Sequence, residues 1–96
     1  MSVDFTSVTN HNERAVFEMV SRFAERHPGL SDDAELLADV ACVALNRLPP
    51  RYIRHQVDFV FYLSDRERQD NERALLEAVE YAFGFVQARS AMRARV

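Results

Sequence analysis

Apolar residues recur at helical spacing near the start of the chain. The stripe consists of Val16, Val20 and Phe23, at positions i, i+4 and i+7. Asn10 supplies a side-chain acceptor three positions before Glu13, which is the spacing of a helix-capping box. Pro28 and Gly29 cannot continue a helix. The pattern therefore predicts a first helix from Asn10 to about His27.

A broader apolar face predicts a second, more central helix. Its members are Leu36, Leu37, Val40, Ala41, Ala44, Leu45 and Leu48. Asp32 and Glu35 repeat the capping-box spacing, so we expect this helix to begin at Ser31 or Asp32. Pro49 and the proline after it end the helix, and Pro49 favours an extended backbone at Leu48.

Strict alternation replaces helical spacing over residues 57–63. One face carries Val57, Phe59, Phe61 and Leu63. β-Branched and aromatic residues dominate this segment, which favours a strand. The rest of the chain has no second strand pattern, so pairing with the same strand of a second subunit is expected. The alternative interpretation is a short, fully buried helix.

The longest helical pattern fills the C-terminal third of the chain. Ser64 and Glu67 form another capping box, and the helix is expected from about Asp65 to Arg93. Its core stripe is Leu75, Leu76, Val79, Ala82, Phe83 and Val86. The sequence thus predicts a mostly α-helical domain of three main helices with one short strand pairing across a homodimer. Residues 1–9 lack periodicity and are expected to form a flexible tail, and residues 10–96 form the single domain.

Composition narrows the class of protein. The 96 residues are 48% hydrophobic and 28% charged, which excludes a mainly disordered chain. No apolar stretch has the length of a membrane span, and the N-terminus lacks a secretory signal pattern, so a cytoplasmic protein without membrane partners is expected. A net charge of −3 disfavours direct binding to nucleic acid. The single Cys42 lies within the second helix and is expected in the core.

The run around the two prolines is the most unusual feature. Arg47, Arg51 and Arg54 lie close together with no acidic residue between them. The prolines fix the direction in which the chain leaves the helix, so they hold Arg47 in a set relation to the later arginines. A local cationic cluster on an acidic protein is suited to a small polyanion.

The same run resembles the late competence development ComFB-like family. The family signature is a helix reading Asp-Val-x-x-x-Ala-Leu-Asn followed by Leu-Pro-Pro-Arg-Tyr. This chain has Asp39-Val40, Ala44-Leu45-Asn46 and Leu48-Pro49-Pro50-Arg51-Tyr52. The likeness extends over roughly residues 10–88 and includes Asn12-Glu13, Phe61-Tyr62-Leu63-Ser64 and Glu67-Arg68.

The resemblance implies a small cytoplasmic bacterial domain, commonly dimeric and without known catalysis. Some members look like receptors for cyclic dinucleotide second messengers, chiefly cyclic di-GMP. Firmicute members carry a zinc-binding cysteine cluster, whereas this chain has Pro28-Gly29-Leu30-Ser31 in the corresponding loop. The resemblance therefore implies a member that lacks the zinc site. The three histidines and Cys42 show no metal-ligand spacing, so neither metal nor cofactor is expected.

A cyclic dinucleotide offers two phosphates and two purine bases. The candidate ligand-binding residues are Arg47, Arg51, Tyr52, Arg54, His55 and Asp58. Arginine binds phosphate bidentately or stacks on a base, Tyr52 could stack, and His55 could contact phosphate. A carboxylate at Asp58 could accept from guanine N1 and N2, which favours cyclic di-GMP over cyclic di-AMP without deciding between them.

Two other interpretations stay open. In the first, Arg51 and Arg54 pair with acids such as Asp39 or Asp58, and Tyr52 fills the core. The chain would then be an interaction module without a ligand, whose Leu-Pro-Pro-Arg-Tyr run only shapes the fold. In the second, the ligand lies between two subunits instead of within one. Catalysis has no motif to support it, so we expect a non-enzymatic regulatory protein that acts on a further protein.

Overall fold

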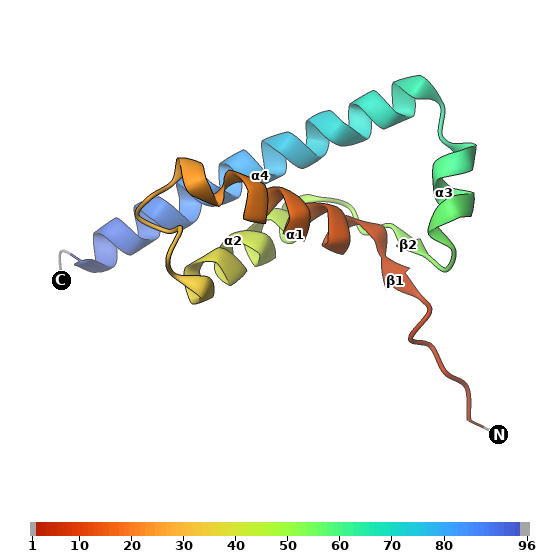
Figure 1. Cartoon of the computed structure of the whole chain (residues 1–96), viewed down its shortest axis with the longest axis horizontal. Coiled ribbons are helices and arrows are strands. Elements are labelled where there is room, and N and C mark those ends of the chain that lie inside the picture. Colours follow the sequence, from red (N-terminus) through yellow and green to blue (C-terminus); the bar gives the residue numbers. More distant parts are fainter. Residues whose placement is uncertain (1, 95–96) are drawn as a thin grey trace.

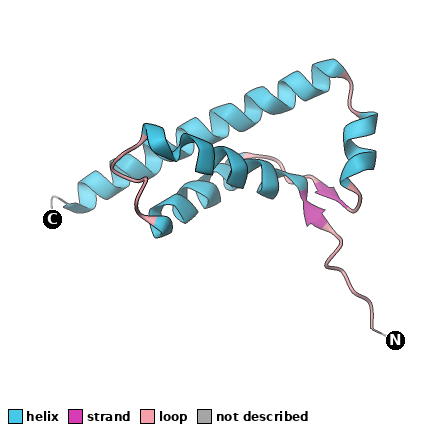
Figure 2. Ribbon diagram, in the orientation of Figure 1, coloured by secondary structure: helices cyan, strands magenta, loops and turns pink. Residues whose placement is uncertain are grey.

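The computed structural model describes residues 2–94, apart from the side chains of Asp58, Val60 and Tyr62. The elements, in chain order, are β1 (Thr9–Asn10), α1 (His11–Phe23), the 3₁₀ turn η1 (Ala24–Arg26), α2 (Ala34–Arg47), β2 (Tyr52–Ile53), α3 (Gln56–Tyr62) and α4 (Asp65–Ala94). Figure 1 shows their arrangement, and Figure 2 shows how far helix dominates it. The prediction of three main helices is confirmed.

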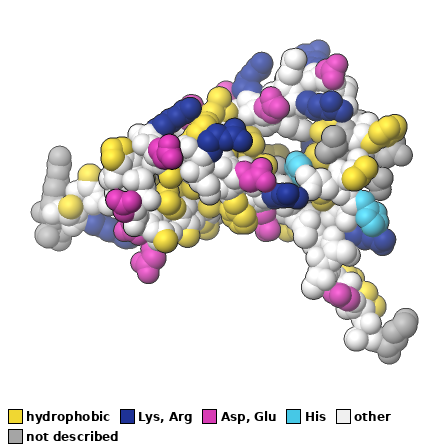
Figure 3. All heavy atoms as spheres, viewed as in Figure 1, with side chains coloured by type: hydrophobic (Ala, Val, Ile, Leu, Met, Phe, Trp, Pro, Cys, Tyr) yellow, Lys and Arg dark blue, Asp and Glu magenta, His cyan; other side chains and the backbone are white. Residues whose placement is uncertain are grey.

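The core lies where α1 and α2 pack against the C-terminal part of α4. Its buried members are Val16, Val20, Phe23, Leu30, Val40, Ala41, Ala44, Ala78, Val79, Ala82, Phe83 and Val86. Figure 3 shows hydrophobic side chains along this seam, with charged side chains around it. The N-terminal part of α4, residues 65–74, is exposed and extends away from the core toward α3. The buried residues of α4 therefore lie in its part that packs on α1 and α2, whereas the part next to α3 is exposed to solvent.

The caps of α1 and α4 follow the local sequence. The Asn10 side chain accepts from the backbone N–H of Asn12, so Asn10 is the N-cap of α1 as predicted, but among the described residues Glu13 does not complete the predicted capping box. Ser64 and Glu67 form the reciprocal capping box at α4: the Ser64 hydroxyl accepts from the Glu67 N–H at 3.1 Å, and the Glu67 carboxylate accepts from the Ser64 N–H at 3.3 Å. Leu48 ends α2 in an extended conformation, as Pro49 requires.

α2 begins at Ala34, two or three residues later than the predicted start at Ser31 or Asp32. Asp33, and neither Ser31 nor Asp32, caps the helix by accepting from the N–H of Leu36 at 3.1 Å. The segment before it forms turns in which the N–H of Leu30 donates to the carbonyl of His27. These turns place Leu30 in the core at 2% exposure, and the helix begins only after they are complete.

Residues 57–63 do not form the predicted strand: Gln56–Tyr62 is the helix α3. A helix pairs its own backbone donors and acceptors, so the segment needs no neighbouring strand. The alternative of a short helix is confirmed, but its full burial is wrong, because Val57 and Phe61 are each 79% exposed. Phe59 and Leu63, one turn apart, are half-buried on another face.

The strands that do exist pair within the chain. Thr9 pairs with Ile53 and Asn10 with Tyr52 in a two-residue antiparallel ladder. The predicted pairing of residues 57–63 with a second subunit therefore has no strand to form it. The ladder instead connects the start of α1 to the linker that follows α2.

Cys42 is exposed, which corrects its expected place in the core. The buried positions of α2 are Val40, Ala41 and Ala44. At 100° per residue, position 42 lies about 200° around the helix from Val40 and from Ala44. Its apolar sequence neighbours were therefore a poor guide to its environment.

Within the described residues, none of the helices combines the length and the apolar character that crossing a membrane requires.

Candidate functional site

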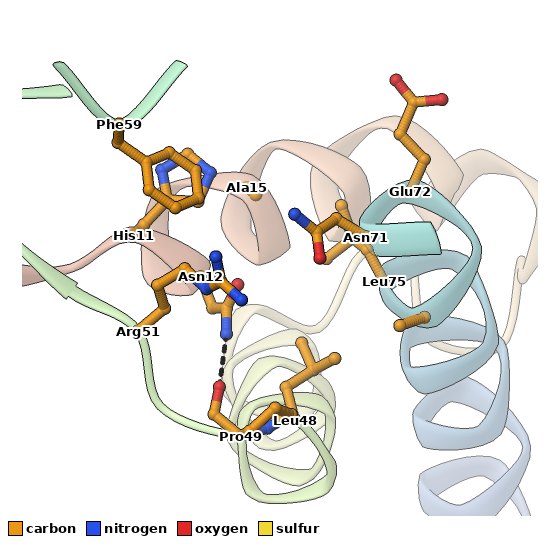
Figure 4. A pocket seen from close by; sticks show the side chains of 11 residues that line it. His11, Asn12, Ala15, Leu48, Pro49, Arg51, Phe59, Asn71, Glu72 and Leu75 are labelled. Atoms are coloured by element: carbon orange, nitrogen blue, oxygen red, sulfur yellow. Dashed lines mark hydrogen bonds between the residues drawn. The ribbon is translucent and has the colours of Figure 1, made fainter. Parts of the chain in front are cut away.

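The first residues of α1 fix the linker between α2 and α3. The Asn10 side-chain oxygen accepts from the N–H of Arg51 at 3.1 Å as well as from its own helix. The N–H of His11 donates to the carbonyl of Arg51 at 2.7 Å. The Asn12 side-chain amide donates to the carbonyl of Pro49 at 2.8 Å (Figure 4). Three successive residues thus position the backbone around Arg51.

A cavity of about 240 Å³, the inner cavity, opens beside this linker. Its lining residues are His11, Asn12, Ala15, Leu48, Pro49, Arg51, Phe59, Asn71, Glu72, Ala74 and Leu75. They come from α1, the linker, α3 and the exposed part of α4, so the cavity exists only because these four segments meet. In Figure 4 the Asn71 amide points toward Asn12 and Arg51, whereas the Glu72 carboxylate lies at the rim and points away.

Two side chains from different elements pack on the Phe59 ring. The His11 ring lies 4.4 Å from it, centroid to centroid, and the Arg51 guanidinium lies 5.2 Å from its centroid. Burial, and to a lesser degree the charge of Arg51, lowers the pKa of His11. Among these three packed side chains, Arg51 therefore carries the positive charge at neutral pH.

A more open recess, the outer groove, adjoins the inner cavity and has a volume of about 460 Å³. Arg51 and Phe59 line both recesses. The outer groove is further lined by Ile53, Arg54, His55, Leu63 and Glu67. The guanidinium of Arg54 lies 3.1 Å from the Nε2 atom of His55. Two arginines and a histidine therefore surround one groove.

Three of the six predicted ligand-binding residues come together here: Arg51, Arg54 and His55. Arg47 lies elsewhere, with its guanidinium 3.7 Å from the centroid of the Tyr81 ring on α4. Tyr52 lines neither recess and is 68% exposed, so it does not fill the core either. The side chain of Asp58 lies outside the described residues.

The interpretation in which Asp39 pairs with Arg51 or Arg54 is wrong. Asp39 instead forms an ion pair with Arg89 of α4 at 3.3 Å. Among the described side chains, neither Arg51 nor Arg54 forms an ion pair with an acid. No acid whose side chain is described therefore neutralises the guanidinium groups of Arg51 and Arg54.

Sequence reasoning did not select several residues of the inner cavity: His11, Asn12, Phe59, Asn71 and Glu72. Reading residues 56–63 as a helix would have placed Phe59 and Leu63 on one face. Asn71 and Glu72 carry no comparable signal, because polar residues near the start of a long helix usually face only solvent.

The site combines guanidinium groups, an aromatic plane and a side-chain amide, which are groups that can bind anions and flat polar rings. No cluster of three or more potential metal ligands occurs among the residues the structure describes.

Together these features define a small helical domain with an arginine-centred surface recess. The chain matches the family described as Late competence development protein ComFB over residues 9–90, and it belongs to that family. No curated protein and no solved structure was found to match it.

Proposed function

We propose that this ComFB-family protein is a non-enzymatic, cytoplasmic receptor for a cyclic dinucleotide, preferably cyclic di-GMP. The observation that carries the proposal is the position of Arg51. Its guanidinium lies between two recesses, over an aromatic ring, and without an acidic partner among the described side chains. An unpaired arginine over an aromatic plane can bind a phosphate while a base stacks beside it.

The sizes of the two recesses suit half of such a ligand. Pockets for small molecules usually measure about 300–1,000 Å³. The inner cavity, at about 240 Å³, is slightly smaller and would hold one base. The outer groove, at about 460 Å³, would hold the adjoining sugar and phosphate beside Arg54 and His55. The second half of the ligand would project from the subunit.

We propose that the receptor is a homodimer. A compact protein of this mass exposes about 5,600 Å², whereas this chain exposes 7398 Å². The exposed tail and α3 carry part of the excess, and a second copy could cover about 800 Å² or more on each chain. The projecting half of the ligand could then contact the partner subunit, and the altered dimer would act on a downstream protein.

Calorimetric titration tests the receptor function. We expect cyclic di-GMP to bind the wild-type protein at micromolar concentration or below, with cyclic di-AMP as the comparison ligand. Arg51→Ala should weaken binding about 10- to 100-fold, because a charge-assisted hydrogen bond contributes about 1.5–3 kcal/mol. Arg54→Ala should weaken it less, because Arg54 lines only the open groove.

Arg22→Ala is the matched control, since Arg22 lies in the last turn of α1 and lines neither recess. It should bind like the wild type. Folded wild-type protein that releases no heat with either nucleotide would contradict the receptor function.

The second candidate function is an interaction module that has no ligand. It is favoured by the backbone role of the Leu-Pro-Pro-Arg-Tyr run, since α1 holds the carbonyls of Pro49 and Arg51. It is also favoured by the exposed apolar side chains of Val57 and Phe61. In that case Arg51→Ala would change no binding, whereas Val57→Asp would remove binding to the partner protein.

A further inference from the structure

Asn71 presents an unpaired amide to the inner cavity. Its side chain points toward Asn12 and Arg51 in Figure 4, and among the described residues it forms no hydrogen bond. An amide has both donor and acceptor atoms, so it can pair with the polar edge of a base. Leu75, one turn further along α4, lines the same cavity and supplies an apolar contact below it.

Glu72 is the one acidic residue among the described side chains that line the inner cavity. No ion pair to it occurs among the described residues, whereas Glu67 of the outer groove is occupied by its hydrogen bond to Ser64. Glu72 points away from the cavity (Figure 4). Because its side chain is exposed, it can change rotamer rapidly when a ligand arrives.

We propose that Asn71 and Glu72 form a subsite for the hydrogen-bonding edge of one guanine base, and that this subsite sets the preference for guanine over adenine. This inference rests on the proposed receptor function. It assigns base recognition to α4, whereas Arg51 binds the phosphate from the opposite side of the cavity.

The chemistry of the two bases explains the preference. Guanine presents two adjacent donors, N1–H and the N2 amine, beside the O6 acceptor. The Glu72 carboxylate accepts from both donors, and the Asn71 amide donates to O6. Adenine presents an acceptor at N1, so it would leave the carboxylate facing a lone pair. A site built to hydrogen-bond one ligand discriminates strongly against a ligand that leaves its polar groups unpaired.

The experiment compares three ligands on four proteins. Cyclic di-GMP, cyclic di-AMP and cyclic di-IMP, whose hypoxanthine bases lack the N2 amine, are titrated into the wild type, Glu72→Gln, Asn71→Ala and Glu80→Gln. Glu80 is an exposed carboxylate on the same helix that lines neither recess, so its variant is the matched control. Circular dichroism verifies that each variant is folded.

We expect Glu72→Gln to weaken cyclic di-GMP binding about 10- to 100-fold and cyclic di-AMP binding much less. The wild type should bind cyclic di-IMP more weakly than cyclic di-GMP, and Glu72→Gln should reduce that difference. Asn71→Ala should weaken cyclic di-GMP binding, and Glu80→Gln should not.

Two results would overturn the inference while leaving the receptor intact. One is a wild type that binds cyclic di-GMP and cyclic di-AMP equally. The other is selective binding that Glu72→Gln and Asn71→Ala leave unchanged, although Arg51→Ala abolishes it. A folded wild type that binds none of the three ligands would instead overturn the proposed function itself.

Discussion

At the residue scale, His11 links the site to pH. It contacts Phe59, and burial and the nearby Arg51 charge lower its pKa from the ordinary 6.5. The unfolded chain regains the ordinary pKa, so in the pH range between the two pKa values it binds more protons than the folded chain. The contribution of neutral His11 to stability is therefore present above pH 6.5 and is lost as the pH falls through the folded pKa.

His11→Gln should flatten this part of the pH dependence. We expect the free energy of unfolding of the wild type to fall more steeply than that of the variant between about pH 7.5 and about pH 5. Urea denaturation at several pH values measures both. Parallel curves for the two proteins would show that His11 titrates alike in the folded and unfolded chains.

Gly84 is a second residue with a testable consequence. It lies within α4, and an added Cβ atom would meet nothing within 4 Å. Its φ is not positive, so alanine fits the same backbone. Gly84→Ala should stabilise the protein by about 0.5–1 kcal/mol, because glycine is a poor helix former. The reciprocal change at an exposed position, Ala88→Gly, should cost a similar amount in urea denaturation. A destabilised Gly84→Ala protein would mean that something covers this position in solution.

At the scale of the elements, Asn10 connects α1 to the linker after α2, whereas an ordinary helix cap bonds only to its own helix. Its side-chain oxygen accepts from the N–H of Asn12 and from that of Arg51, whereas Asp33 accepts only from Leu36. We expect Asp33→Ala to cost about 1 kcal/mol, as a lost cap does. Asn10→Ala should cost about 1 kcal/mol more, because a second backbone donor loses its acceptor.

Thermal and urea denaturation of the two variants measure the difference. Equal losses of stability would mean that water replaces Asn10 at the Arg51 amide without cost. Because this bond positions the linker, Asn10→Ala should also weaken nucleotide binding, and Asp33→Ala should not.

The elements also show what the sequence can and cannot predict. Caps such as Asn10 and Ser64 bond to backbone N–H groups two or three positions further on, so the local sequence locates them. Asp32 and Asp33 carry the same side chain, and the capping residue is Asp33, which follows the turns that bury Leu30. A strand was preferred over the helix α3 because the same alternating pattern also describes a helix with one face toward the site and another toward solvent.

The candidate site was predictable only in part for a related reason. Arg51, Arg54 and His55 are close in sequence and remain close in the fold. Asn71 and Glu72 reach the inner cavity because α4 passes beside the linker, and such long-range contacts leave no local signal. Arg47 lines neither recess, because helix geometry turns its guanidinium toward Tyr81.

At the scale of the whole molecule, the chain is more extended than its length requires. A compact domain of 96 residues has a radius of gyration of about 12.5 Å, and this chain has 15.7 Å. We expect sedimentation equilibrium to give twice the monomer mass of 11.1 kDa at micromolar concentration. A monomer under these conditions would contradict the dimer without affecting the subsite, and nucleotide should be added in a second run to test whether it promotes pairing.

The half-packed α4 has a mechanical consequence. Its buried section begins at Ala78, and the exposed section ahead of it is a straight rod with a rise of about 1.5 Å per residue. Asn71 lies about 10 Å along the helix from Ala78, and Asp65, which follows α3, lies about 20 Å from it. When this section pivots about Ala78 as a rigid body, Asp65 moves about twice as far as Asn71. A displacement of about 1 Å that a ligand imposes at Asn71 would therefore become about 2 Å at the end that carries α3.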